Sequence, residues 1–214
     1  MIKKKCLFIW LLFVVFKMNA QAVYNDGLVS YDVTIAGSDN PTYLAYFKDA
    51  SMKLYLRGMK ARSELKTALG STTTIHDKQT GNAVILNEYG DQKIMVKMNA
   101  AQYKQVNKKY ENPEVEYLNE TKIINGYKCS LVKVKFSGGN TFSVFYAPEL
   151  NFQNNYFGLP VELKGFPLEY EAEIGGVKVL YKANTISTGA VQAALFDLPT
   201  SGYREMKFEE MPKN

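Results

Sequence analysis

The sequence predicts a single domain that is mainly β, with antiparallel strands. Strand-like segments follow one another at short intervals and are separated by turn residues, as in consecutive hairpins. The chain has 15 tyrosines, a residue type suited to a pleated, half-buried surface. No internal repeat or low-complexity linker divides it. We therefore expect one β domain over residues 23–207, a signal peptide before it at 1–22, and a polar C-terminal tail at 208–214.

The first 22 residues have the three parts of a cleavable signal peptide. Lysines occupy positions 3–5, an apolar run extends over residues 6–16, and residues 20–22 read Ala-Gln-Ala. The apolar run is too short to cross a hydrocarbon core of about 30 Å as a helix. The segment predicts export to the periplasm or the cell exterior, with no transmembrane span after cleavage.

Cleavage after Ala22 would change the charge of the protein. The removed segment contains four lysines and no acidic residue, so the formal net charge falls from +5 to +1. A nearly neutral protein lacks the positive field that nucleic-acid binding requires, and no nucleic-acid partner is expected. Cleavage also removes Trp10 and Cys6, leaving Cys129 without a disulfide partner.

The most complete hairpin is predicted around the loop Gly175-Gly176. This loop places Tyr170 opposite Tyr181 on one face and Glu169 opposite Lys182 on the other. Apolar pairs on one side and opposite charges on the other are typical of a half-solvated antiparallel pair. We expect a hairpin over residues 168–183.

A second hairpin is predicted at Asn125-Gly126, a dipeptide that strongly favours a two-residue turn. Its register places Lys122 opposite Cys129. A cysteine at this position is expected to be a small packing residue, with a thiol made inert by burial.

A third hairpin is predicted with Arg57-Gly58 as its loop, which sets Leu56 against Met59 and Lys53 against Arg62. The remaining elements come from alternation and capping signals. Strands are expected at 28–35, 72–76, 83–88, 93–98 and 141–146, and short helices at 41–50 and 99–108.

Little in the sequence indicates catalysis. His76 is the only histidine, which excludes a zinc site built on several imidazoles, and no calcium loop is present. The polar run before His76 predicts that this residue faces solvent at the end of a strand. A Cys129–His76 nucleophile and base is the alternative, but nothing local makes the thiol reactive. We expect no enzyme activity, no cofactor and no metal.

The segment 148–160, PELNFQNNYFGLP, is too irregular for a strand and too apolar for an idle loop. It is interpreted in two ways. It is either a flap whose aromatic rings meet a ligand in a hydrophobic cavity, or a loop that covers one end of the sheet.

Several short motifs occur in a characteristic order: residues 52–62, the hairpin 121–129, the segment 163–168 and Phe196-Asp197-Leu198-Pro199. Together they resemble a family of exported Gram-negative proteins that is a domain of unknown function. That family looks related to the lipoprotein-carrier superfamily. The resemblance implies a curved antiparallel half-barrel sheet with a few short helices across its open side. It supplies no catalytic residues.

The resemblance implies that a lipid or another apolar molecule lies between the curved sheet and its helical cover. The leading hypothesis is a non-enzymatic binding protein for such a ligand. The alternative is a structural or interaction module of the cell envelope that binds a protein or a glycan. The candidate ligand-lining residues, each of which could instead be ordinary core, are Met52, Leu54, Leu56, Met95, Met98, Phe152, Tyr156 and Phe157.

Overall fold

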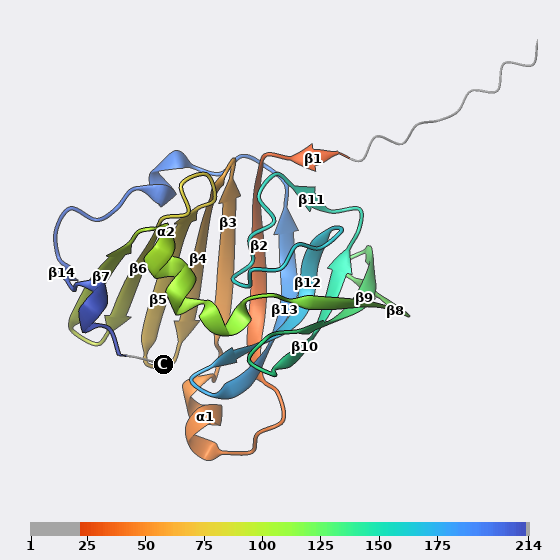
Figure 1. Cartoon of the computed structure of the whole chain (residues 1–214), viewed down its shortest axis with the longest axis horizontal. Coiled ribbons are helices and arrows are strands. Elements are labelled where there is room, and N and C mark those ends of the chain that lie inside the picture. Colours follow the sequence, from red (N-terminus) through yellow and green to blue (C-terminus); the bar gives the residue numbers. More distant parts are fainter. Residues whose placement is uncertain (1–21, 213–214) are drawn as a thin grey trace, which may run out of the picture.

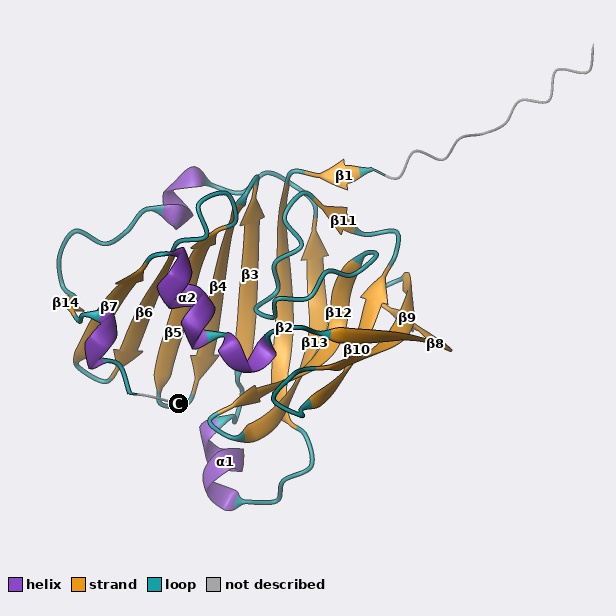
Figure 2. Cartoon of the chain, in the orientation of Figure 1, coloured by secondary structure: helices purple, strands orange, loops and turns teal. Residues whose placement is uncertain are grey.

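The computed structural model describes residues 22–212, and the predicted signal peptide lies almost wholly outside them. Within this range the chain forms one large, open, curved sheet of twelve strands (Figures 1 and 2). The sheet strands are β2 (Asp26–Ile35), β3 (Ser51–Arg57), β4 (Lys60–Thr67), β5 (Gly70–Asp77), β6 (Ala83–Tyr89), β7 (Gln92–Met98), β8 (Glu114–Ile124), β9 (Tyr127–Lys135), β10 (Thr141–Ala147), β12 (Phe166–Ile174), β13 (Val177–Ser187) and β14 (Arg204–Glu205). This confirms the predicted curved antiparallel half-barrel.

The strand order shows how two meanders build the sheet. It runs β14-β7-β6-β5-β4-β3-β2-β13-β12-β10-β9-β8, and every pairing except β14 with β7 is antiparallel. The two meanders meet where β2 pairs with β13. The chain must therefore pass from β7, near one edge, to β8 at the other. That connection crosses the concave face and carries the helical cover (Figure 1).

The crossing segment contains the helix α2 (Ala100–Val106) and the 3₁₀ helix η1 (Lys108–Tyr110). Asn99 caps α2 through a capping box with Gln102, which satisfies two N-terminal backbone donors. The helix α1 (Pro41–Tyr46) begins after the N-cap Asn40 and protrudes beyond one end of the sheet. Both helices lie where the sequence predicts them, although each is shorter than expected.

Two of the three predicted hairpins are confirmed residue by residue, and the third is wrong in register. The β12–β13 and β8–β9 hairpins have the expected partners. In the β3–β4 hairpin the loop is Gly58-Met59, so Lys53 lies opposite Glu64 instead of Arg62. Gly58 has a φ of +54°, which glycine adopts at little cost and which fits a tight hairpin turn. The shift of the loop replaces a like-charge pair by an opposite-charge pair.

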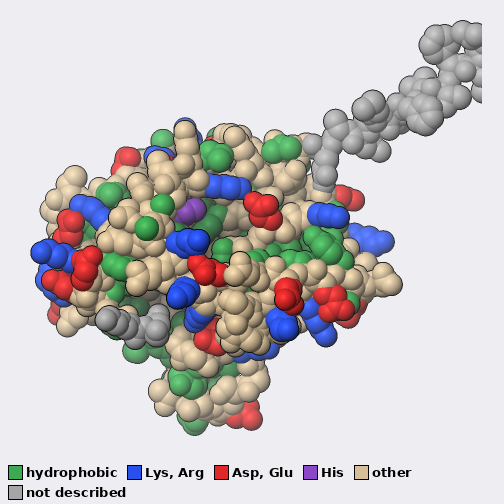
Figure 3. Space-filling model, viewed as in Figure 1, with side chains coloured by type: hydrophobic (Ala, Val, Ile, Leu, Met, Phe, Trp, Pro, Cys, Tyr) green, Lys and Arg blue, Asp and Glu red, His purple; other side chains and the backbone are tan. Residues whose placement is uncertain are grey.

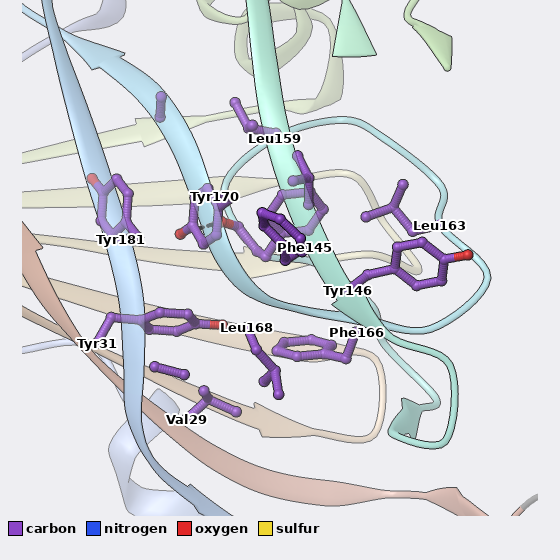
Figure 4. Close-up of a cluster of buried hydrophobic side chains, with 14 of the residues drawn as sticks. Val29, Tyr31, Phe145, Tyr146, Leu159, Leu163, Phe166, Leu168, Tyr170 and Tyr181 are labelled. Carbon is purple, nitrogen blue, oxygen red and sulfur yellow. Dashed lines mark hydrogen bonds between the residues drawn. The ribbon is translucent and has the colours of Figure 1, made fainter. Parts of the chain in front are cut away.

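The main core fills the concave side of the sheet where β2, β12 and β13 meet. Tyr170 and Tyr181 stack with centroids 4.7 Å apart, and Tyr31 meets Tyr170 edge-on (Figure 4). These rings pack against the connection 148–165, which crosses the same face (Figure 1). Two buried hydroxyls anchor this region, because Tyr31 donates to the carbonyl of Pro167 and Tyr170 to that of Phe157.

The connection 148–165 is attached to the N-terminal part of the domain. Its short strand β11 (Asn151–Phe152) pairs in parallel with β1 (Val23–Tyr24). Phe152 is buried and lies against Gly27 of β2.

A second connection covers the opposite face of the sheet. Residues 188–203, here called the strap, follow β13 and include the 3₁₀ helix η2 (Ala193–Phe196). Val191 and Phe196 of the strap cover Ile75 of β5. Both faces of the sheet are therefore buried in this region.

The segment 208–214, expected to be a polar tail, begins with the 3₁₀ helix η3 (Phe208–Glu210). Phe208 and Met211 pack in a cluster with Tyr103 and Val106 of α2. Among the helices of residues 22–212, none combines the length and apolar character that a membrane crossing requires.

Candidate functional site

A cavity of about 730 Å³ lies on the face that carries α2. Its walls come from the end of β5, from α2 and the segment after it, and from residues 154–162 of the connection across the concave face. The volume falls within the roughly 300–1,000 Å³ typical of ligand pockets. The single histidine of the chain is visible at the surface of this face (Figure 3).

Three aromatic side chains meet at one end of the cavity. The imidazole of His76 lies 4.8 Å from the ring of Tyr156 and 5.0 Å from that of Tyr103, measured between centroids. The two tyrosine hydroxyls share a hydrogen bond. These residues, which we call the aromatic clamp, come from β5, from the connection 148–165 and from α2. The clamp therefore joins both covering segments to the sheet.

The prediction that His76 simply faces solvent is only partly right, because the residue reaches the surface (Figure 3) but stacks on two tyrosine rings. The side chain is half-buried, and its Nδ1 atom is fully covered with no hydrogen-bond partner. Burial lowers the pKa of His76, an effect that the charge of Lys78 adds to and that of Asp77 opposes. His76 and Ile75 are neighbours on β5, so their side chains point to opposite faces of the sheet. The strap buries Ile75 on the convex face, and His76 therefore points to the concave face, where it lines the cavity.

Two asparagines shape the wall formed by the connection 148–165. Asn154 is buried; its Nδ2 donates to the carbonyl of Met59 and its Oδ1 accepts from the backbone N–H of Tyr156. The Oδ1 of Asn155 accepts from the backbone N–H of Phe152. These amides hold the wall in place, because Asn155 bonds within the connection and Asn154 ties it to the β3–β4 turn at Met59.

The remaining lining is apolar at depth and charged at the rim. Tyr110, Leu159 and Val161 are buried and contribute apolar surface. The charged lining residues are Lys78, Lys104, Glu111 and Glu162. Lys104 and Glu111 approach within 3.7 Å.

Of the eight candidate ligand-lining residues, the structure places Tyr156 on this cavity. Five others are buried in the main core: Met52, Leu54, Leu56, Phe152 and Phe157. Met98 lies in the cluster beneath α2. Met95 faces the opposite side of the sheet, since it pairs with Leu86 near the strap. The connection 148–160 thus contributes to both the core and the cavity.

Cys129 is a packing residue, as predicted. It has no exposed surface, and burial raises the pKa of its thiol to about 11. Six strands separate its strand β9 from β5, which carries His76. This placement argues against the alternative of a Cys129–His76 catalytic pair. In the described part of the chain, no group of three or more histidine, cysteine or acidic side chains is placed to hold a metal ion.

The site residues missed in the sequence are His76, Lys78 and Tyr103. Tyr103 carries a signal, because it lies three residues before Val106 on the apolar side of a predicted helix. Nothing in the local sequence shows which face of β5 receives the helix, so His76 could not be placed.

Several solved structures resemble the chain. PNGF-II matches with a TM-score of 0.49 and 12% identity, over 85% of this chain and 30% of its own. An uncharacterized conserved protein from Thermus thermophilus matches with a TM-score of 0.48 and 9% identity, over 86% of this chain and 91% of its own. MucB matches with a TM-score of 0.42 and 11% identity, over 82% of this chain and 58% of its own. The chain spans less than a third of the PNGF-II chain, and similarity at this level implies nothing about function.

The search for similar curated proteins found no match. Residues 45–161, which include β3 to β11, α2 and most of the cavity wall, match a defined family over more than half of the chain. The chain therefore belongs to the family described as Domain of unknown function (DUF4412).

Proposed function

We propose that the protein is an exported, non-enzymatic binding protein for a lipid or another largely apolar molecule, and that the cavity beneath α2 holds this ligand. The observation that carries the proposal is a cavity of about 730 Å³ between the sheet and its cover, lined by Tyr110, Leu159 and Val161. The predicted signal peptide supports export to the periplasm or the cell exterior.

The energetics favour a ligand of some size. Micromolar affinity corresponds to about 8 kcal/mol, and association costs at least about 4 kcal/mol more. At about 25 cal/mol per Å², the ligand must bury on the order of 500 Å² of apolar surface. A small fragment cannot meet this requirement, whereas an acyl chain or a ring system can.

The first test is native mass spectrometry of the protein extracted gently from the cells that produce it. A lipid-sized adduct that survives transfer supports the proposal. A protein found free of adduct, and unable to take up any apolar probe added in excess, contradicts it.

A matched pair of variants tests the location of the ligand. Ala100 and Ala101 are neighbours at the start of α2 and both are exposed, but only Ala100 lines the cavity. Ala100→Trp should fill part of the cavity and weaken binding of an apolar probe by about tenfold or more. Ala101→Trp adds the same side chain outside the cavity and should leave binding unchanged. Equal effects of the two substitutions would place the ligand elsewhere.

A second candidate function rests on the edge strand β8. Tyr117 and Ile123 on this strand are 46% and 67% exposed, and the outer edge of β8 is unpaired within the described residues. Exposed edges of this kind pair with strands of other proteins. A stoichiometric protein partner in the same mass spectra, lost on Ile123→Lys, would support an envelope interaction module.

A further inference from the structure

The aromatic clamp presents hydrogen-bond donors to the cavity. Nδ1 of His76 is covered and unpaired, and a buried lone pair is tolerated better than a buried N–H without an acceptor. We therefore assign the neutral tautomer that carries its proton on Nε2. No hydrogen bond links the imidazole of His76 to any other described residue, so the Nε2 proton remains available to a molecule in the cavity.

The tyrosine pair supplies a second donor. One hydroxyl of Tyr103 and Tyr156 donates to the other, and this shared bond uses one of the two hydroxyl hydrogens. The Asn107 side chain also interacts with the Tyr103 hydroxyl, and with its amide N–H as the donor the other hydrogen is left without an acceptor among the described residues. It lies at the same end of the cavity, because both rings contact His76.

Lys78 supplies the third donor. It lines the cavity two residues after His76, and its charge acts on the imidazole. Within residues 22–212 the ammonium group of Lys78 forms no ion pair. The neighbouring carboxylate of Asp77 accepts hydrogen bonds from the backbone N–H groups of Gln79 and Thr80 instead.

Three donors at one end and an apolar wall beside them define a chemical class of ligand. We propose that the cavity binds an amphiphile whose head group offers acceptor oxygens, such as a carboxylate or an ester carbonyl, to His76, Lys78 and the hydroxyls of the clamp. Its apolar part then lies along Leu159 and Val161. This inference rests on the proposed function and adds the head-group chemistry to it.

The charged residues at the rim of the cavity indicate that a hydrogen-bond acceptor on the ligand contributes more to binding than the net charge of the ligand. Lys78 and Lys104 are balanced by Glu111 and Glu162, which also line the cavity. A neutral ester therefore retains the contacts with the imidazole and the hydroxyl. A carboxylate gains in addition from Lys78. A head group without an acceptor leaves the imidazole N–H and the tyrosine hydroxyl desolvated and unpaired, which is unfavourable.

The test compares three probes that share a dodecyl-length chain: dodecanoate, methyl dodecanoate and dodecyltrimethylammonium. Each displaces a fluorescent apolar probe from the protein, which yields three Kd values. We expect dodecanoate and the ester to bind about tenfold or more tightly than the ammonium compound. His76→Phe keeps an aromatic ring but removes one of the three donors, and should reduce the ratio of Kd values. His76→Gln restores a donor and should recover part of the ratio.

Two further variants separate charge from hydrogen bonding. Lys78→Met should reduce the preference for dodecanoate over the ester, whereas Lys108→Met removes an exposed lysine outside the cavity and should not. Replacing both Tyr103 and Tyr156 by Phe removes both hydroxyls, whereas either single replacement would leave one hydroxyl hydrogen free. This double variant provides a second measurement of the ratio if His76→Phe fails to fold, as judged by circular dichroism. Binding of all three probes with similar affinity, or a ratio unchanged both in His76→Phe and in the double tyrosine variant, would overturn this inference while leaving the cavity as a binding site. No binding of any probe would instead reject the proposed function.

Discussion

The imidazole of His76 stacks on the ring of Tyr156, with centroids 4.8 Å apart and planes inclined by 25°. This contact joins a sheet strand to a connection that begins more than 70 residues later in the chain. Tyr103 of α2 completes the arrangement through its own contact with His76. His76 is therefore a titratable residue of the sheet that both segments covering the concave face contact.

The clamp predicts that the protein loses stability as the pH falls below neutrality. Burial lowers the pKa of His76 from 6.5 in the folded state, so the unfolded state binds a proton first. The free energy of unfolding should therefore decrease as the pH drops through about 6.5 and level off below the folded-state pKa. The groups near the imidazole are Asp77 at the end of β5, Lys78 directly after that strand, Tyr103 from α2 and Tyr156 from the opposite wall.

Urea unfolding at pH 5.5 and pH 7.5 measures this effect in wild type and in His76→Phe. His76 is the only histidine, so the variant removes the only side chain with an ordinary pKa in this window. In the variant, the free energy of unfolding should differ less between pH 5.5 and pH 7.5 than it does in wild type. A difference equal to that of wild type would mean that His76 does not cause it.

The hairpins could be predicted because their information is local. In the β12–β13 hairpin a turn, an apolar face and two opposite-charge pairs all specify one register. The register predicted with Arg57-Gly58 as the loop is wrong. Apolar residues near the turn allow the partners to shift by two positions while every side chain stays on the same face of the sheet. Only the charges of Lys53, Arg62 and Glu64 distinguish the two registers.

The site could not be predicted because it depends on contacts between distant segments. The strap lies more than 110 residues after Ile75 and makes the second face of β5 apolar. The polar run before His76 therefore could not show that this residue lies under the cover of the sheet. The candidate methionines show a related limit: alternation places Met95 and Met98 on opposite faces of the strand, but it does not show which face holds the cavity.

Gly27 should tolerate no side chain, although its backbone is unstrained. A Cβ atom at this position would lie 2.2 Å from Cε1 of Phe152. Gly27→Ala should therefore destabilise the protein by about 1–3 kcal/mol through overpacking. Chemical denaturation measures the loss, and Phe152→Leu provides the partner for a double-mutant cycle. The double variant should lose less than the sum of the two single losses. Additive losses would show that Phe152 is not the obstacle.

Cys129 should resist thiol reagents in the folded protein. Burial raises its pKa to about 11, so little thiolate exists at neutral pH and the sulfur is out of reach. Labelling in buffer should be slow, and urea should restore the rate of a free thiol. A Cys6→Ser background leaves Cys129 as the only thiol. Fast labelling without denaturant would contradict the buried position.

The strap should detach first when Arg62 is replaced. The Arg62 side chain is only 17% exposed; its Nη1 donates to the carbonyl of Leu195 over 2.9 Å, and its Nε bonds to Glu64. Arg62→Met leaves that carbonyl and a partly buried carboxylate without their donor, at a cost of about 1–3 kcal/mol. Hydrogen exchange should therefore accelerate at the amides of Leu195 and Asp197 more than in β13. Arg204→Met, which removes an exposed arginine from β14, serves as the control. A uniform acceleration across the sheet would instead mean that Arg62 supports the whole fold and not the attachment of the strap.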